Sequence, residues 1–322
     1  MPAISITDTY NALLSSTFAM RAKILWDNLV DSVTLLKLID AGNTKQTGSG
    51  HRIEFPLLYG SNSTVGRRGD YDTIDTTKQD GITIGALSWK NVSGTVTIST
   101  REEAMNSGKE QVGKLIDWKS QQLEVTMRNT VNSDLFSLGS TAQQIEGLQY
   151  WLRTATATVA SIDDSTNTWW QNRSLTSVGS FASNGRDKMR NLYNTCSIRD
   201  NNDPPTDIFT TQLIHEALEK TIEPAERLDI SRPTGTANIG AEKFKFRSAM
   251  VHWDDKCLSG AMYMLNLRDR KVQWWVLKDH DFDALPFVRP SDQAARTSIV
   301  QLVANLAMTV RRSMGVMTGV TA

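Results

Sequence analysis

The longest regular pattern of apolar residues in the sequence lies in residues 100–138. Apolar side chains there recur three or four positions apart, as they do along one face of an α-helix. The stripe consists of Met105, Val112, Leu115, Ile116, Leu123, Met127, Val131 and Leu135. Thr100 and Glu103 have the spacing of a capping box at the helix start, and Gly139 is the expected stop. We therefore predict one helix of roughly 55 Å, along which other elements must pack.

Alternating apolar and polar positions precede this helix. Residues 52–57 alternate like a β-strand, Ile82, Ile84 and Ala86 share one face, and residues 92–98 continue the alternation. Residues 60–81 between these strands are almost wholly polar. A loop of about twenty residues is rare inside a compact domain and is usually functional or disordered. We predict a two-stranded arm with a mobile tip, which lies on another molecule because an isolated hairpin is only marginally stable.

The N-terminal region has helical spacing over residues 9–40. This amphipathic segment either docks on its own domain or reaches a neighbouring subunit as an arm, and the sequence favours neither. Residues 42–50 are rich in Gly, Ser and Thr, which predicts a flexible hinge.

The pattern after residue 139 mixes helices and strands. Helical spacing covers residues 186–198, and a short strand at residues 206–209 leads through a Thr cap into a helix over residues 213–222. Apolar runs at 262–267 and 272–277 flank a polar turn and predict a hairpin. Residues 298–311 fit either a long strand or a helix, and we favour the strand. The order indicates an α+β fold.

Composition narrows the class of protein. The chain has 322 residues, about two domains' worth, and its 35 Lys and Arg balance 35 Asp and Glu. Zero net charge argues against nucleic acid as the dominant partner, although a local basic face stays open. We expect no secretory signal and no membrane span, since no run of about eighteen apolar residues occurs. Cys196 and Cys257 have neither metal nor redox spacing and are predicted to be buried, reduced thiols.

Catalytic motifs are absent from the sequence. It has no Gly-rich phosphate loop, no His-Glu-x-x-His and no nucleophile elbow. The best candidate is the acidic segment formed by Asp279, His280, Asp281 and Asp283. A metal there would need further donors, of which His215 and His252 are the obvious ones. A metal-dependent hydrolase is thus one alternative, but a solvated acidic turn is favoured, and we expect no catalysis and no cofactor.

The order of these elements resembles that of a tailed-bacteriophage major capsid protein with the Hong Kong 97-type fold. The resemblance covers nearly the whole chain and rests on element order and length. It implies an N-terminal arm (1–49), an extended β-hairpin loop (50–98) and a peripheral domain with a long spine helix (99–144). An axial domain (145–285) and a closing β segment of the peripheral domain (286–322) complete the implied α+β architecture.

The resemblance also implies a function and partners. A member of this family self-assembles into pentamers and hexamers of an icosahedral shell around double-stranded DNA. It forms the virion after assembly in the host cytoplasm. The implied partners are further copies of the chain, a separate scaffolding protein, a portal and packaged DNA contacted non-specifically, with no membrane. A decoration protein is left open. The alternative is another virion or surface-array structural protein, which would assemble as tubes or sheets.

The residues expected to contact a neighbouring subunit lie on the hairpin loop. They are Arg67, Arg68, Asp70, Tyr71 and Lys78. The charged side chains would form ion pairs, and the tyrosine would supply an aromatic anchor. Lys78 lies in the region where some relatives carry a cross-linking lysine, but no activating Glu or partner Asn is identified in the sequence. A solvated loop fits the same residues equally well.

Overall fold

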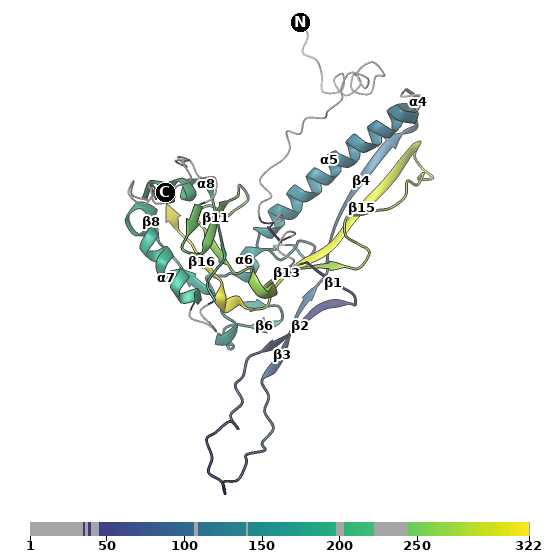
Figure 1. Cartoon of the computed structure of the whole chain (residues 1–322). Helices are drawn as coiled ribbons and strands as arrows, with labels where there is room; N and C mark the ends of the chain where they lie inside the picture. The colour runs from purple at the N-terminus through teal and green to yellow at the C-terminus, as the bar shows by residue number, and fades with distance from the viewer. Residues whose placement is uncertain are drawn as a thin grey trace, which may run out of the picture.

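The computed structural model describes residues 35, 38–39, 45–105, 109–139, 141–197, 203–221 and 244–321. Three parts are visible in Figure 1: a helix lying along a long β ribbon, a mixed body around a second sheet, and a hairpin that projects away from both. The predicted helical segment at residues 9–40 lies outside the described residues except for Leu35, Leu38 and Ile39. These three are helical, and Leu35 and Ile39 are buried in the main core.

The first sheet is built on one long strand. It has five strands in the order β1-β13-β15-β14, with β4 also paired to β15. The strands are β1 (Lys45–Gly48), β4 (Lys90–Ser99), β13 (Val272–Leu277), β14 (Asp283–Ala284) and β15 (Ala295–Met308). β15 pairs antiparallel with β4 from Ala295 opposite Ser99 to Ala304 opposite Lys90. The predicted closing strand is therefore confirmed, with a start and an end three residues earlier than expected.

The spine helix lies against β4 (Figure 1). It is described as α4 (Thr100–Met105) and α5 (Lys109–Leu135), and residues 106–108 lie outside the described part. The predicted stripe is buried at Leu115, Met127, Val131 and Leu135. Met105 is 60% exposed, so its assignment to the buried face is wrong. The helix approaches β4 closely at Gly94, where a Cβ atom would lie 2.4 Å from Leu123 Cδ1.

The helix begins at Thr100, as predicted, but its capping box is shifted by one residue and its last residue by three. The capping box is formed by Ser99 and Glu102, not Thr100 and Glu103: Glu102 N donates to Ser99 Oγ (3.1 Å) and Ser99 N donates to Glu102 Oε2 (3.1 Å). Thr100 N and Oγ1 both donate to Ala294 O instead, because β4 is still paired beside the start of β15 there. At the other end α5 stops at Leu135, and Gly139 turns the chain four positions later with φ +70°.

The predicted flexible hinge at residues 42–50 is wrong where it is described. Lys45–Gly48 forms β1, which pairs in parallel with β13. A Cβ atom at Gly48 would lie 3.0 Å from both the Trp89 and the Trp275 ring. Gly48 therefore allows close packing against these two rings. The glycine that was interpreted as a sign of flexibility instead makes room for a contact.

The second sheet forms the body of the molecule. It has six strands in the order β10-β11-β9-β12-β16-β7. They are β7 (Arg173–Leu175), β9 (Asp207–Thr210), β10 (Phe244–Phe246), β11 (Ala249–Trp253), β12 (Met262–Leu265) and β16 (Gly315–Met317). The helices α7 (Arg186–Ser197) and α8 (Gln212–Thr221) pack on it, which confirms the strand–helix unit expected near residue 210.

The hairpin predicted across residues 262–277 is wrong. β12 pairs with β9 and β16 in the second sheet, whereas β13 pairs with β1 and β15 in the first. The connection passes through Asp269 and Arg270, both with positive φ, and carries the chain between sheets. Two apolar runs beside a short turn therefore do not pair with each other, because each pairs with strands of a different sheet.

Sheet membership crosses the boundaries of the expected domains. β13 and β14 belong to the first sheet although they lie in the 145–285 range, and β16 belongs to the second although it lies in 286–322. The short strand β17 (Val320–Thr321) likewise pairs with β8 (Gly179–Ser180). Among the described strands the chain thus passes three times between the two sheets, after β4, after β12 and after β15. The five ranges remain a prediction as domains.

Arg311 lies in the last of these passages. It lies in the 3₁₀ turn Arg311–Ser313, between β15 and β16, with its side chain fully buried. Its guanidinium donates to Trp151 O (2.8 Å) and Trp170 O (3.0 Å). It also reaches Asp164 Oδ2 (3.2 Å) and Asn172 Oδ1 (3.1 Å), and burial lowers its pKa while Asp164 opposes that shift. One cation therefore holds three chain segments at the junction.

We predict that Arg311→Ala destabilises the protein by about 3–5 kcal/mol, since it leaves the Asp164 carboxylate buried without its cation. Chemical denaturation followed by circular dichroism measures this. The neighbouring exposed Arg312 is the matched control, and Arg312→Ala should change the free energy of unfolding by less than about 0.5 kcal/mol. Equal effects of the two substitutions would contradict the role given to Arg311.

A second comparison tests the buried half of the spine helix. Leu135→Ala removes a fully buried side chain and should cost about 2–5 kcal/mol. Met105→Ala, on the exposed part of the same predicted stripe, should cost less than about 0.5 kcal/mol. Thermal unfolding of both variants provides the measurement, and a Leu135→Ala variant as stable as the parent would show that the stripe is not part of the core.

Candidate assembly surfaces

The base of the hairpin is a two-stranded sheet attached to the body. β2 (Arg52–Leu58) and β3 (Ile82–Ser88) pair antiparallel from Arg52 opposite Ser88 to Leu58 opposite Ile82. Ile53, Phe55 and Leu57 point inward and belong to the main core. The alternation predicted for residues 52–57 is therefore confirmed.

The opposite face of this hairpin is apolar and exposed. Leu58 is 74%, Ile82 67% and Ile84 57% accessible to solvent. The sequence correctly placed Ile82 and Ile84 on one face, but that face points outward, because the pleat turns Gly85 and Leu87 inward. A contiguous apolar surface of this kind is typical of a protein contact site.

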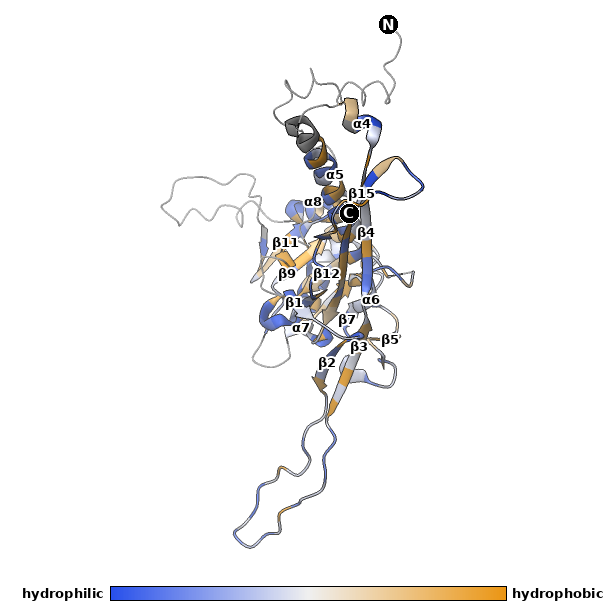
Figure 2. Cartoon of the chain, turned by 90° about the vertical axis from the view of Figure 1, so that its right-hand side faces the viewer, coloured by the Kyte–Doolittle hydropathy of each residue, from blue (hydrophilic) through white to orange (hydrophobic). Residues whose placement is uncertain are grey.

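The loop between the two strands extends from residue 60 to residue 81, as predicted. The ladder ends where Tyr59 N (2.9 Å) and Gly60 N (3.3 Å) donate to Gly81 O. Beyond that point the described loop residues are held by short-range bonds, such as Thr64 N to Asn62 Oδ1 (2.9 Å). Figure 2 shows a mainly hydrophilic loop that projects far beyond the apolar bands of β2 and β3. The loop has little to bury against its own subunit.

Four of the five residues predicted to contact a neighbour have exposed side chains without the bracing role in the loop that Arg68 has. Arg67, Asp70, Tyr71 and Lys78 are exposed, and Tyr71 is 100% accessible. Arg68 differs, because its guanidinium donates to Thr64 O (2.8 Å) and Thr73 O (3.0 Å) and so braces the loop itself. The intersubunit role of these residues stays a prediction.

The sequence missed the residues that fix the hairpin to the body. The Tyr59 ring stacks on Trp169, with centroids 5.2 Å apart and planes 21° apart. Ala86 N donates to Ala160 O (3.1 Å). Trp169 lies in the 3₁₀ turn Thr168–Trp170, far away in sequence, so no local pattern could have indicated the contact. The hairpin therefore has a defined direction relative to the body.

A buried polar cluster fixes the root of the hairpin. Lys90 Nζ lies 3.0 Å from Glu146 Oε1, and the Asn305 amide donates to Glu146 and to Ser88 O (2.8 Å). Lys90 Nζ also donates to Ala142 O (2.9 Å). The cluster joins β3, β4 and β15 to the segment before α6 (Leu148–Trp151), and each charge has a partner.

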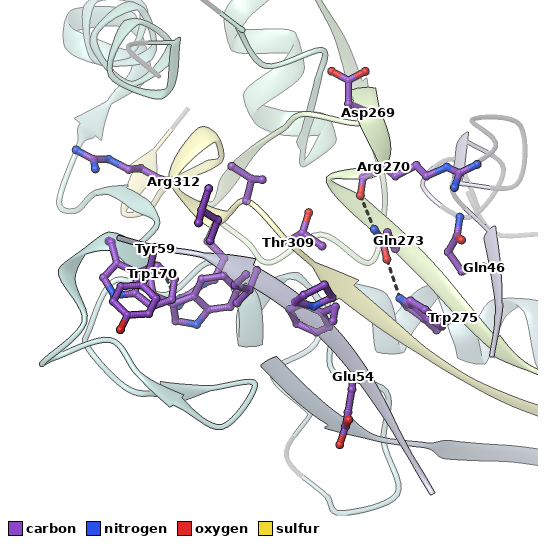
Figure 3. Close-up of a pocket in the computed structure, with 17 residues that line it drawn as sticks. Gln46, Glu54, Tyr59, Trp170, Asp269, Arg270, Gln273, Trp275, Thr309 and Arg312 are labelled. Atoms are coloured by element: carbon purple, nitrogen blue, oxygen red, sulfur yellow. Dashed lines mark hydrogen bonds between the residues drawn. The ribbon is translucent and has the colours of Figure 1, made fainter. Parts of the chain in front are cut away.

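A cavity of about 620 Å³ opens beside the hairpin base (Figure 3). Residues 54–59 of the hairpin form one side, and Trp169 and Trp170 extend it. The other side is formed by the first sheet and its connections, including Gln46, Arg270, Gln273 and Trp275. Gln273 bridges this wall, since Trp275 Nε1 donates to its side chain (2.9 Å), which in turn donates to Arg270 O (2.8 Å).

The acidic segment at 279–283 is not assembled as a metal centre in the described part of the chain. Asp281 forms an ion pair with Lys45, and His252 Nε2 lies 3.0 Å from Asp207 Oδ1 in the second sheet. No group of three or more His, Cys, Asp or Glu residues that could hold a metal occurs among the described residues. No described helix is long and apolar enough to cross a membrane.

Three solved structures share the fold of this chain over almost its whole length. The capsid asymmetric unit of cyanophage A-1(L) has a TM-score of 0.69 at 16% identity, covering 94% of this chain and 96% of that one. The capsid of a native GTA particle scores 0.66 at 9% identity, covering 95% and 98%. The holo-SrpI encapsulin complex from Synechococcus elongatus PCC 7942 scores 0.56 at 12% identity, covering 94% and 95%.

These likenesses confirm the predicted α+β fold of the Hong Kong 97 type. No family model matches the sequence, and no curated protein matches it either. With identities this low, the comparison establishes the fold.

The two cysteines give a prediction for the folded subunit. Cys196 and Cys257 are free and buried, as expected, and burial raises the pKa of each thiol to about 12. Iodoacetamide at pH 8 should therefore label neither thiol in the native protein and both after unfolding, as read by intact mass. Because the unfolded thiols ionise near pH 8.5, the free energy of unfolding should also fall as the pH rises above about 9. Rapid labelling of the native subunit would contradict this burial.

Proposed function

We propose that this chain is a major capsid protein that self-assembles into an icosahedral shell. The observation that carries the proposal is the fold shared with the cyanophage A-1(L) capsid over 94% of the chain. The exposed hairpin supports it independently, since it presents an apolar face and a polar loop that its own subunit does not cover. Catalysis is not part of the proposed function.

The energetics of the hairpin favour a multi-copy assembly. Ordering a residue's backbone costs about 1–2 kcal/mol, and the loop offsets little of that cost within its own subunit. The exposed side chains of Leu58, Ile82 and Ile84 would stabilise the assembly by about 25 cal/mol for each Å² of apolar surface that a neighbour buries. Arg67, Asp70 and Tyr71 add charged and aromatic contacts at the tip. Hairpin and neighbour thus stabilise each other, which links folding of the arm to assembly.

The finer features of the proposal follow from the capsid assignment. The chain would form pentamers and hexamers, enclose double-stranded DNA and contact it non-specifically. Scaffolding and portal functions would be supplied by separate proteins, and assembly would take place in the host cytoplasm.

An encapsulin-type shell is the second candidate, because the encapsulin complex of Synechococcus elongatus also shares the fold. The higher TM-score of the cyanophage capsid, 0.69 against 0.56, favours the first candidate. Particles isolated from cells that make this chain naturally should protect double-stranded DNA from nuclease. Closed particles without protected DNA would favour the encapsulin-type shell.

Self-assembly is tested by expressing the full chain, alone and with a co-expressed scaffolding protein from its genomic neighbourhood. Sedimentation and negative-stain microscopy should show closed particles of uniform diameter. A species that remains monomeric under all conditions would overturn the proposed function, and tubes or sheets would favour another structural array protein.

Shortening the hairpin separates folding from assembly. Replacing residues 62–78 by a two-residue turn should leave the circular dichroism spectrum and the melting temperature of the subunit nearly unchanged, because the loop lies outside the core. The same change should abolish or strongly weaken particle formation by sedimentation. The substitution Leu213→Ser, at an exposed apolar residue of α8 outside the hairpin, is the control and should assemble normally. Normal particles from the shortened chain would show that the loop is dispensable.

A further inference from the structure

We propose that Lys90 and Asn305 become joined by an isopeptide bond within one subunit, with Glu146 as the acid and base of the reaction. The bond forms once in each folded chain and turns over no substrate. It lies in the buried polar cluster at the root of the hairpin, so it is distinct from any contact between copies and does not rest on the proposed function.

Three side chains meet in this cluster in the order that the chemistry needs. Lys90 Nζ lies 3.0 Å from one carboxylate oxygen of Glu146, and the Asn305 amide nitrogen donates to the other. The carboxylate therefore touches both the nucleophile, an amine, and the leaving group, an amide nitrogen. A group in this position can take a proton from the first and give one to the second.

The backbone brings the two reacting residues together. Lys90 is the first residue of β4 and pairs with Ala304 of β15, and Asn305 is the next residue of β15. Ala142 O accepts from Lys90 Nζ (2.9 Å), and Ser88 O accepts from Asn305 Nδ2 (2.8 Å), so both side chains are held in place. Reactants that folding already holds side by side need little further loss of entropy to react.

The Asn305 carbonyl is polarised by two backbone donors. Its Oδ1 accepts from Leu306 N (2.9 Å) and from Glu146 N (3.2 Å). Attack on Cγ moves negative charge onto this oxygen, and two N–H groups aimed at it stabilise that charge as an oxyanion hole does. An ion pair between Lys90 and Glu146 alone needs neither these donors nor an amide on the carboxylate.

Burial favours the reactive protonation states. Lys90 and Asn305 are buried, and only 13% of the Glu146 side chain is accessible to solvent. Charges are costly in such surroundings, so transfer of a proton from the ammonium to the carboxylate costs less there than in water. The transfer leaves a neutral amine, which is the nucleophile, and a neutral acid.

The reaction balances without a further reactant. The neutral Lys90 amine attacks Cγ of Asn305 and forms the new C–N bond, while Glu146 gives its proton to Nδ2 and takes one from Nζ. The bond between Cγ and Nδ2 then breaks, the carbonyl forms again, and ammonia leaves. Ammonia takes the proton from Glu146 and departs as ammonium, so Glu146 ends as the carboxylate with which it began.

Intact-mass measurement of the purified full chain, combined with tryptic mapping, tests the bond. We expect a mass lower than that of the sequence by one ammonia, and a branched peptide that joins Lys90 to Asn305. Glu146→Gln keeps the shape of the side chain but removes the acid, and should slow the mass loss by about 10²–10⁴-fold. The matched control is Lys119→Arg, in the ion pair between Lys119 Nζ and Glu102 Oε2 (3.0 Å), and it should react like the parent.

Loss of ammonia alone does not identify the bond, because an asparagine can also lose ammonia by closing a ring with its own backbone. Lys90→Arg separates the two reactions, since it prevents the isopeptide bond but not the ring closure. A folded parent chain of full mass would overturn the proposal, and so would a Lys90→Arg variant that loses ammonia as the parent does.

The role of Glu146 has its own readout. A Glu146→Gln variant that is folded by circular dichroism and still reacts at the parental rate would overturn that role. If the variant does not fold, the branched peptide of the parent chain decides whether the bond exists. All of these measurements are made on the subunit, so they stand or fall separately from particle formation and from the proposed function.

Discussion

The guanidinium of Arg311 is buried where the chain leaves its first sheet for its second, and a buried cation is stable only when its surroundings supply partners. Trp151, Asp164, Trp170 and Asn172 supply them, all from the segment that follows the spine helix. The hairpin packs against the same segment, because the Tyr59 ring stacks on Trp169 and Ala86 N donates a hydrogen bond to Ala160 O. The direction of the arm relative to the body therefore depends on this junction. A second polar cluster around Lys90, Glu146 and Asn305 fixes the root of the arm in the same way.

Local patterns predicted the elements whose stabilisation is local or strongly periodic. The apolar stripe of the spine helix, the long strand β15 and the alternation in β2 all follow from periodicity, and each is present. The shifted capping box shows the limit of such reasoning: Ser99 and Glu102 have the same spacing as Thr100 and Glu103, and the pairing of β4 with β15 decides between them. The supposed hairpin at 262–277 and the supposed hinge at 42–50 failed because distant strands competed for the same backbone groups.

The candidate contact surface was predicted only in outline. The loop and its exposed residues could be recognised from composition, whereas the outward direction of Ile82 and Ile84 depends on which face of the pleat the core occupies. The cavity could not be predicted at all, since its walls come from segments as far apart as Gln46, Trp169 and Arg312.

The central claim is that the hairpin of each subunit lies on a neighbouring copy in a closed shell. A cryo-electron microscopy reconstruction of assembled particles tests this most directly. The predicted result is an icosahedral shell with ordered density for residues 60–81 in contact with the adjacent subunit. A closed shell in which this loop touches no neighbour would contradict the account, as would an assembly without icosahedral symmetry.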